Sequence, residues 1–262
     1  MPFLTDRESL LSPRRVRQQQ YLHRLALVLG GFFIIFSIFW IISFCVNYKY
    51  RYIEPSILAC KSPKYDYNLL AIRWTPTFCF AKKCVNSTEN WDIHGLWPSW
   101  TNGSEGPEFC CRTWGFTKTD LTPILPDLDE DWPNQLSNRD KDSLWKHEWD
   151  KHGTCSTLAH SGGLINYFNT TITLFKKYPI QSWLSENNIV PTPLTGPAYT
   201  LEQIHNATSS KLGKRISIRC ITKKGKQLID SIYLCFEPSS MVPVDCPPDA
   251  CRKTRLILPQ AH

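Results

Sequence analysis

The segments WDIHGLWP (91–98) and WKHEWDKHGTC (145–155) decide how this sequence folds and what it can do. Together they hold three of the seven histidines in the chain. On an α-helix, His147, Glu148, Lys151 and His152 would project within about 140° of the circumference, because each residue turns by about 100°. Tryptophans flank these four ionisable groups, and a cysteine follows them. This favours a constrained polar site over a solvated charged face.

Metal-dependent hydrolysis is the first alternative that the pattern excludes. A His-Glu pair opens the zinc-protease motif, but the second histidine of that motif stands four positions later, where this chain has Lys151. A lysine there would repel the cation. The chain also lacks a Gly-x-Ser-x-Gly segment. We therefore expect neither a metal ion nor another cofactor.

Two histidines, a carboxylate and a lysine can instead cleave a phosphodiester that supplies its own nucleophile. One imidazole takes the proton of a ribose 2′-hydroxyl, while a second, protonated imidazole gives one to the departing 5′-oxygen. An imidazole titrates near pH 6.5, so it suits both tasks. DNA is excluded as a substrate because it lacks that hydroxyl.

Both segments resemble the active-site segments of the ribonuclease T2 family of acid endoribonucleases. The resemblance extends from about Tyr67 to Cys246 and covers roughly three quarters of the chain. It implies an α+β fold in which an antiparallel sheet is packed with helices and stapled by disulfides. It also implies metal-free transesterification of single-stranded RNA to 2′,3′-cyclic phosphates and then to 3′-phosphates.

The resemblance further implies a role for each polar residue of the two segments. His94 corresponds to the general acid and His152 to the general base, with His147 contacting phosphate. Glu148 and Lys151 correspond to the pair that stabilises the pentacovalent phosphorus.

Base recognition is the part of the resemblance that is incomplete. Trp97 corresponds to the aromatic residue on which a base stacks. However, Ser99 stands where some members have an acidic residue, and neither Ile72 nor Arg73 is the glutamine often found before the first motif tryptophan. The sequence therefore leaves the base preference open.

Cysteine usage indicates an oxidising compartment, since ten of the eleven cysteines lie after residue 46. The remaining one, Cys45, is expected to stay free or acylated. The resemblance implies that the disulfides are Cys79–Cys84, Cys220–Cys251, Cys235–Cys246, and Cys155 with Cys110 or Cys111, while Cys60 takes whichever of the last two is left.

A stretch of 22 uncharged residues, 25–46, predicts a single transmembrane helix that anchors the protein in a lipid bilayer. We expect a tail (1–24), the signal anchor (25–46), a stalk (47–63) and a ribonuclease domain (64–262). The chain has 262 residues, 42% of them hydrophobic, and a net charge of +7, which fits one globular domain with a mild bias toward anionic partners.

Basic residues alone barely decide the orientation of the anchor, but the cysteines and the glycosylation sequons do. All the sequons follow the apolar stretch, and they begin at Asn86, Asn102, Asn169 and Asn206. We therefore expect a type II protein with a cytosolic N-terminus and a lumenal or extracellular domain.

The tail carries a possible address for the endolysosomal or vacuolar system. Asp6, Leu10 and Leu11 resemble the acidic dileucine signal that clathrin adaptors bind.

Periodicity and turn residues predict a mixed α+β class. Strands are expected over 67–74, 91–97, 216–222 and 228–236, the last two as an antiparallel hairpin. Helices are expected over 163–178, 200–212 and within 120–156, where Thr119 or Asp120 would cap one helix and Ser137 or Asn138 the next.

Two other functions fit the sequence without catalysis. The protein could be a membrane glycoprotein that keeps the ribonuclease fold for binding proteins, or a lumenal RNA receptor without turnover.

Overall fold

The computed structural model describes residues 13–51, 60, 63–102 and 106–261. The chain divides into two compact units, Met1–Leu58 and Ala59–His262. The predicted adaptor signal at Asp6, Leu10 and Leu11 lies outside the described residues.

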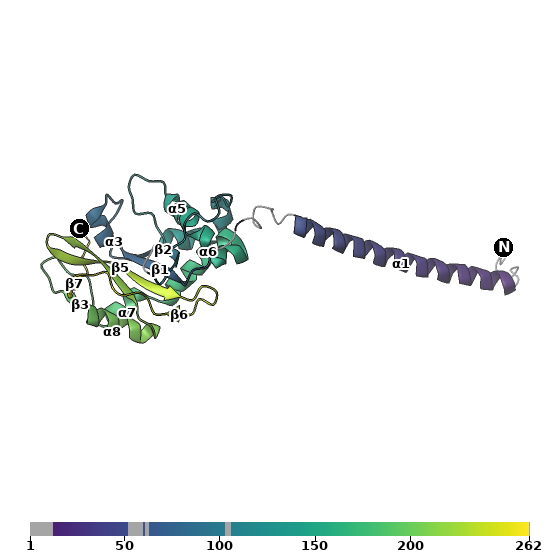
Figure 1. Cartoon of the computed structure of the whole chain (residues 1–262). Helices are drawn as coiled ribbons and strands as arrows, with labels where there is room; N and C mark the ends of the chain where they lie inside the picture. Colours follow the sequence, from purple (N-terminus) through teal and green to yellow (C-terminus); the bar gives the residue numbers. More distant parts are fainter. Residues whose placement is uncertain (1–12, 52–59, 61–62, 103–105, 262) are drawn as a thin grey trace, which may run out of the picture. The chain divides into compact units, whose positions relative to one another are not determined.

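In the first unit, one long helix, α1 (Pro13–Arg51), carries the apolar stretch (Figure 1). Within it, the stretch Tyr21–Ser43 is 23 residues long and contains an 18-residue window with a mean hydropathy of 2.7, none of which is buried in the protein. A helix of that length rises about 35 Å, which is enough to cross a bilayer core of about 30 Å. The predicted span, 25–46, overlaps this stretch.

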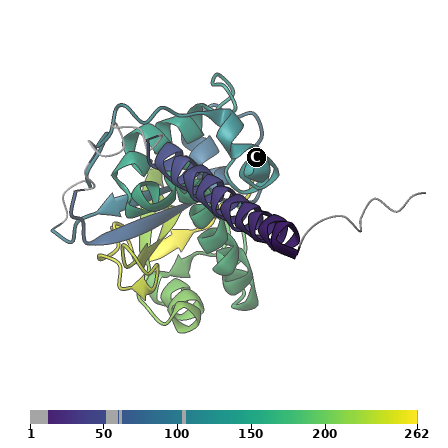
Figure 2. The same ribbon diagram turned by 90° about the vertical axis from the view of Figure 1, so that its right-hand side faces the viewer.

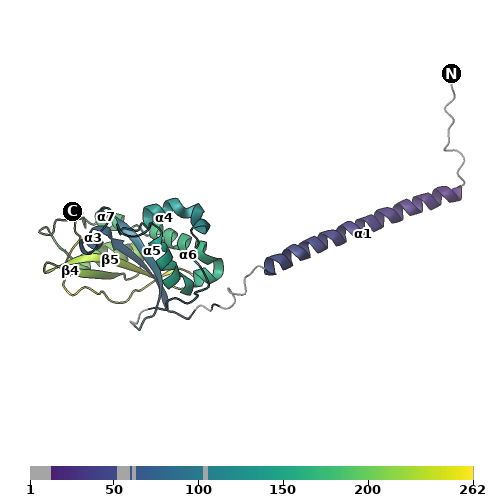
Figure 3. The same ribbon diagram turned by 90° about the horizontal axis from the view of Figure 1, so that it is seen from above.

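The second unit is built on a sheet in which β1 and β5 are central. The strands are β1 (Tyr67–Trp74), β2 (Trp91–Ser99), β3 (Tyr199–Thr200), β4 (Ser217–Lys223), β5 (Lys226–Phe236), β6 (Pro243–Val244) and β7 (Arg255–Ile257). They follow the order β2-β1-β5-β7-β3, with β4 and β6 also paired to β5. Figure 3 shows β4 beside β5.

The predicted antiparallel sheet packed with helices is confirmed, with the difference that β5 and β7 are parallel, so the sheet is mixed. The segment after β6 runs back alongside β4, where Cys246 N donates to Arg215 O and Ala250 N to Ile218 O. This return brings the chain to the start of β5, so Leu256 pairs with Gln227 and the two strands point the same way.

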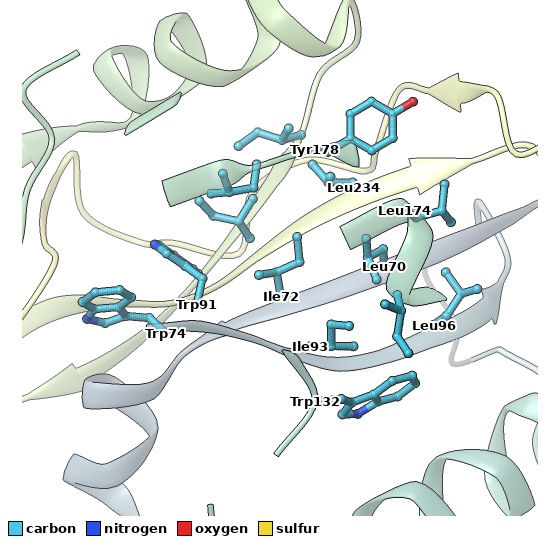
Figure 4. Packing of buried hydrophobic residues seen from close by; sticks show 14 of the residues in the cluster. Leu70, Ile72, Trp74, Trp91, Ile93, Leu96, Trp132, Leu174, Tyr178 and Leu234 are labelled. Carbon is cyan, nitrogen blue, oxygen red and sulfur yellow. The ribbon is translucent and has the colours of Figure 1, made fainter. Parts of the chain in front are cut away.

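Helices cover the sheet on the face that carries the main hydrophobic core. Leu70, Ile72, Ile93, Leu96 and Leu234 point from three strands into this core (Figure 4). The covering elements are η2 (Lys118–Ile124), α4 (Leu125–Asp131) and α6 (Thr157–Lys177). The helices α7 (Ile180–Glu186) and α8 (Leu201–Leu212) contact each other below the sheet in Figure 2.

Several helix boundaries differ from the prediction because local contacts override the periodicity. The helix α6 begins at Thr157, capped by Ser156, and a kink at Gly162 and Gly163 separates its first turns from the predicted 163–178. Helix α5 (Ser143–Lys151) has Asp142 at its N-cap position, so the caps predicted at Ser137 or Asn138 are wrong. Residues 137–142 instead form turns.

Two further elements depart from the sequence-based expectation. The 3-10 helix η2 has Thr117 at its N-cap position, one turn before the predicted caps at Thr119 or Asp120. The helix α3 (Thr75–Ala81), with a proline in its first turn, has no counterpart among the predicted elements. By contrast, Thr200 caps α8 in a complete capping box with Gln203, at the predicted start of that helix.

Five disulfides staple the second unit. Three are the pairs Cys79–Cys84, Cys220–Cys251 and Cys235–Cys246 that the resemblance implies. The open choice is resolved as Cys110–Cys155, which leaves Cys60–Cys111 as the fifth pair. Because Cys60 is bonded to Cys111, the compact unit begins at Ala59, before the predicted boundary at residue 64.

All four sequon asparagines, Asn86, Asn102, Asn169 and Asn206, are exposed on the second unit.

Candidate active site

A β-bulge in β2 sets the position of His94. The register along β1 and β2 shifts between Ala71 and Ile72: Ala71 pairs with Gly95 and Ile72 with Ile93, so His94 is the extra residue. Its carbonyl oxygen accepts a hydrogen bond from Trp132 Nε1 at 2.9 Å. Bulges redirect side chains in this way next to functional sites. Here Ile93 stays in the core while His94 lines the pocket on the other face.

Two tryptophans fix the rotation of α5 and thereby place the second motif. Trp145 Nε1 donates to Trp132 O at 2.7 Å, and Trp149 Nε1 donates to Trp114 O at 2.9 Å. These residues lie one turn apart on the buried side of the helix. Glu148 follows Trp145 by three residues and so lies on the same side of the helix, where it is buried too, with 1% of its side chain exposed.

The end of α5 delivers His152 to the same place. His152 is the C-cap residue of α5, and the chain continues as η3 (Gly153–Cys155), which the disulfide Cys110–Cys155 holds. A Cβ on Gly153 would lie 2.6 Å from Trp149 Cε3, so the tight exit from the helix requires a glycine.

One pocket of about 630 Å³ brings all six predicted site residues together. It is lined by His94, Trp97, His147, Glu148, Lys151 and His152. The ring centroids of His94 and His152 lie 5.0 and 5.3 Å from that of Trp97. The two imidazoles, from segments more than 50 residues apart, therefore converge on one small space.

A hydrogen bond joins the two motifs. Trp97 Nε1 donates to Glu148 Oε2 at 2.8 Å, and the other carboxyl oxygen lies 4.0 Å from His94 Nε2. Gly95 permits this contact, because a Cβ there would lie 2.9 Å from Glu148 Cδ and closer still to the two bonded atoms. Gly95 is thus needed because its lack of a side chain leaves room for the hydrogen bond between Trp97 and Glu148.

Loss of solvation favours the uncharged form of both imidazoles. It lowers the pKa of His94 to about 3, aided by the charges of Arg73, His147, Arg219 and Lys151, although 37% of the His94 side chain is exposed. Desolvation is also the main cause that lowers the pKa of His152 to about 3, and the charges of Lys151 and of the other two histidines lower it further. The His147 pKa is lowered for the same first reason.

The same loss of solvation acts in the opposite sense on the carboxyl group. It raises the pKa of Glu148 to about 8, against the hydrogen bond from Trp97 and the charges of Arg73 and Lys151. Lys151 is not bonded to Glu148. Its Nζ lies 2.9 Å from Glu108 Oε1, in an ion pair in which each side chain is 28% exposed.

The sequence analysis missed several residues that line the pocket, among them Glu108, Arg219 and Tyr233. Glu108 could have been found from its position two residues before Cys110, since the Cys110–Cys155 bond brings that segment to the end of α5. Tyr233 precedes Cys235 by two residues and so shares its face of the strand. No sequence signal distinguishes Arg219 from other exposed cations.

Among the described residues, no group of three or more histidine, cysteine, aspartate or glutamate side chains is arranged to hold a metal ion.

Two imidazoles, a carboxyl group and a lysine in one cleft define an acid–base enzyme for an anionic substrate. The model of the ribonuclease T2 family matches residues 65–246. Ribonuclease Oy of Magallana gigas is 35% identical over 179 residues, covering 66% of this chain and 83% of that protein. Ribonuclease T2 of Danio rerio is 30% identical over 200 residues, covering 75% and 79%.

Solved structures agree with this match. RNase NT in complex with 5′-AMP is similar with a TM-score of 0.67 and 27% identity, covering 75% of this chain and 99% of that one. Ribonuclease MC1 from bitter gourd seeds has a TM-score of 0.66 and 26% identity, covering 74% and 100%. The chain belongs to the ribonuclease T2 family.

Proposed function

We propose that this protein is an endoribonuclease that cleaves single-stranded RNA without a metal ion, through 2′,3′-cyclic phosphates that are then hydrolysed to 3′-phosphates. The observation that carries the proposal is the convergence of His94 and His152 around Trp97 in one pocket with Glu148 and Lys151. The endoribonuclease class itself is that of the family.

In the first step, the 2′-oxygen attacks phosphorus and the bond from phosphorus to the 5′-oxygen breaks. His152 takes the proton of the 2′-hydroxyl, and its low pKa means that the neutral base is already present at acid pH. His94 gives a proton to the departing oxygen. In the second step water attacks the cyclic phosphate, and the two histidines exchange roles.

A bound phosphodiester supplies what His94 needs to act as an acid. Its negative charge raises the pKa of a neighbouring imidazole, so His94 takes up a proton when substrate binds. Glu148, whose pKa is raised to about 8, is a neutral carboxyl group at acid pH. Its Oε1 lies 4.0 Å from His94 Nε2, beyond hydrogen-bond distance, and in this mechanism it donates a hydrogen bond to the charged phosphorane.

Lys151 and His147 complete the phosphate site in this mechanism. The phosphate displaces Glu108 from Lys151, whose ammonium then offsets the growing charge. His147, on the exposed side of α5, contacts phosphate. The half-buried ring of Trp97 stacks one base, a contact worth about 1–3 kcal/mol in comparable proteins.

The anchor and the location of the enzyme form a second part of the proposal. The apolar stretch of α1 spans a bilayer, residues 1–24 face the cytosol, residues 47–63 form a stalk, and residues 64–262 form the ribonuclease domain in the lumen. Five disulfides and four exposed sequon asparagines support that orientation. The dileucine signal directs the protein to an endolysosomal or vacuolar compartment.

The test uses the full-length protein in detergent with single-stranded RNA at about pH 5 and excess chelator. We expect products with 2′,3′-cyclic phosphate ends, which His94→Ala and His152→Ala abolish and a deoxy oligonucleotide does not give. His205→Gln is the matched control, because His205 pairs with Asp249 outside the pocket. Loss of cleavage in chelator, or RNA binding without cleavage, contradicts the proposal.

A further inference from the structure

Arg219 brings a cation into the pocket from a strand that neither motif includes. It lies on β4, and its exposed side chain lines the pocket together with Tyr233 of β5. Ser217 pairs with Tyr233 and Arg219 with Ser231, so Arg219 points to the same face of the sheet as Tyr233.

The aromatic wall of the pocket lies beside this arginine. Arg219 and Tyr233 line the same pocket from one face of the sheet, and Tyr233 is the main cause of the raised pKa of Arg219. The Tyr233 ring in turn stands edge-on to Trp97, with centroids 6.0 Å apart. A chain of contacts thus runs from the first motif through Trp97 and Tyr233 to the guanidinium.

Arg219 keeps its charge available to an anion. Among the ion pairs of the described residues, Lys151 is paired with Glu108, whereas Arg219 has no carboxylate partner within 4.0 Å. The carboxylate of Asp230 interacts with the Arg219 charge electrostatically, without forming an ion pair. The charge also reaches the catalytic centre, since Arg219 is one of the cations that disfavour protonation of His94.

The distance between strands decides which phosphate Arg219 can meet. Across the sheet the order is β2, β1, β5, β4. Neighbouring strands lie about 4.8 Å apart, so the backbone of β4 is about 14 Å from that of β2. The histidines and Lys151 occupy the β2 and α5 side. A phosphate held between them would lie nearer to these groups than to the strand that carries Arg219.

We propose that Arg219, which lies beside Tyr233, binds a phosphate of the RNA strand that flanks the scissile one. This inference rests on the proposed ribonuclease function and extends it to substrates longer than a dinucleotide. An arginine suits this task because its planar guanidinium can donate to a phosphate and to the tyrosine at the same time.

The test compares substrates that differ only in flanking phosphates. Full-length protein in detergent is assayed at pH 5 and low salt on a dinucleoside monophosphate, on the same dinucleotide with an added 5′- or 3′-phosphate, and on a pentanucleotide. The variants are Arg219→Gln, Arg219→Lys and Tyr233→Phe. Arg139→Gln is the matched control, because Arg139 is exposed and does not line the pocket.

We expect Arg219→Gln to raise KM for the pentanucleotide about fivefold, the size of one solvent-accessible charged contact. Any effect on kcat through His94 should be the same for every substrate. The salt dependence of log KM should become shallower by about 0.7 for one lost phosphate contact. Arg219→Lys should recover part of the effect, and Tyr233→Phe should cause a smaller loss. One of the two singly phosphorylated dinucleotides should show the loss and so assign the 5′ or 3′ side.

The plain dinucleoside monophosphate distinguishes the possible failures. Wild-type cleavage of that substrate tests the ribonuclease function alone. If Arg219→Gln weakens it as much as the pentanucleotide, the arginine acts on the scissile phosphate or on the fold, and the inference is wrong. The inference is equally wrong if Arg219→Gln behaves like Arg139→Gln on every substrate.

Discussion

Gly95→Ala adds one methyl group at the point where the two motifs meet, and we expect it to disable the site. The new Cβ would lie 2.9 Å from Glu148 Cδ and closer to Glu148 Oε2 and Trp97 Nε1. Those last two atoms share the 2.8 Å hydrogen bond between the motifs. The backbone of Gly95 is held in the sheet by its pairing with Ala71, so the side chains must move apart.

The expected loss of activity can be calculated from the hydrogen bond between Trp97 and Glu148 that Gly95→Ala would break. A buried hydrogen-bonding group left without a partner costs about 1–3 kcal/mol. If that energy is lost from the transition state, kcat/KM falls between about 5- and 150-fold, because each ~1.4 kcal/mol is a factor of ten. Crowding of a packed interior adds about 1–3 kcal/mol of destabilisation, which lowers Tm.

The assay measures kcat/KM on single-stranded RNA at pH 5 and Tm on the same samples. Gly115→Ala is the control, because a Cβ there meets no atom within 4 Å. Gly95→Ala is also made in a Glu148→Gln background. If Gly95 acts through Glu148, the second substitution adds much less than it does in the wild type. Equal kcat/KM for Gly95→Ala and Gly115→Ala, or full additivity with Glu148→Gln, refutes the reasoning.

Three other predictions concern charge and covalent structure. Binding of 5′-AMP at pH 5 should take up protons, because the pKa values of His94 and His152 are about 3 and a bound phosphate raises them. Calorimetry in buffers of different ionisation enthalpy should detect this uptake. Zero uptake would contradict the prediction. Glu108→Gln should tighten 5′-AMP binding by up to about fivefold, since it frees the paired lysine; weaker binding would oppose this. The Cys60→Ser/Cys111→Ser variant should lose about 4 kcal/mol in denaturant titrations, because the closed loop is 51 residues long; an unchanged midpoint would show that the staple is dispensable.

Stability should also depend on pH, with a sign set by the two imidazoles. Both have a pKa lowered from 6.5 to about 3, so between these values the unfolded chain binds more protons than the folded one. Glu148 opposes this trend between 4.5 and about 8. The free energy of unfolding should therefore fall most clearly as the pH drops from about 4.5 to 3. A His94→Asn/His152→Asn variant should show a flatter curve, and an identical curve would contradict the lowered pKa values.

The sequence is informative where the structure depends on local pattern. The strand 67–74 could be predicted from its apolar run. The hairpin of β4 and β5 could be predicted from two apolar runs that flank a turn, in which Lys224 and Gly225 adopt the positive φ angles that such a turn needs. The two motifs could be assigned to one site because their residue types make chemical sense only together.

The bulge at His94 could not be predicted in the same way. A two-residue alternation through 91–97 places Ile93 and Trp97 on one face of the strand, whereas the structure has Ile93 in the core and Trp97 in the pocket. The shift is stabilised by Trp132 Nε1, which comes from a loop 38 residues away. Likewise, Arg219 reaches the pocket only through the order of four strands. Both features depend on long-range pairing, which no local pattern encodes.

Burial of the pocket suits its chemistry to acid pH. The same desolvation makes two histidines and one glutamate neutral near pH 5, so the pocket is spared the cost of several buried charges. A phosphate anion reverses this balance and draws in protons as it binds. For each proton taken up, affinity falls tenfold with every pH unit above the acid range. The Kd of 5′-AMP should therefore rise at least tenfold from pH 5 to pH 7, and a pH-independent Kd would show that the imidazoles bind phosphate already charged.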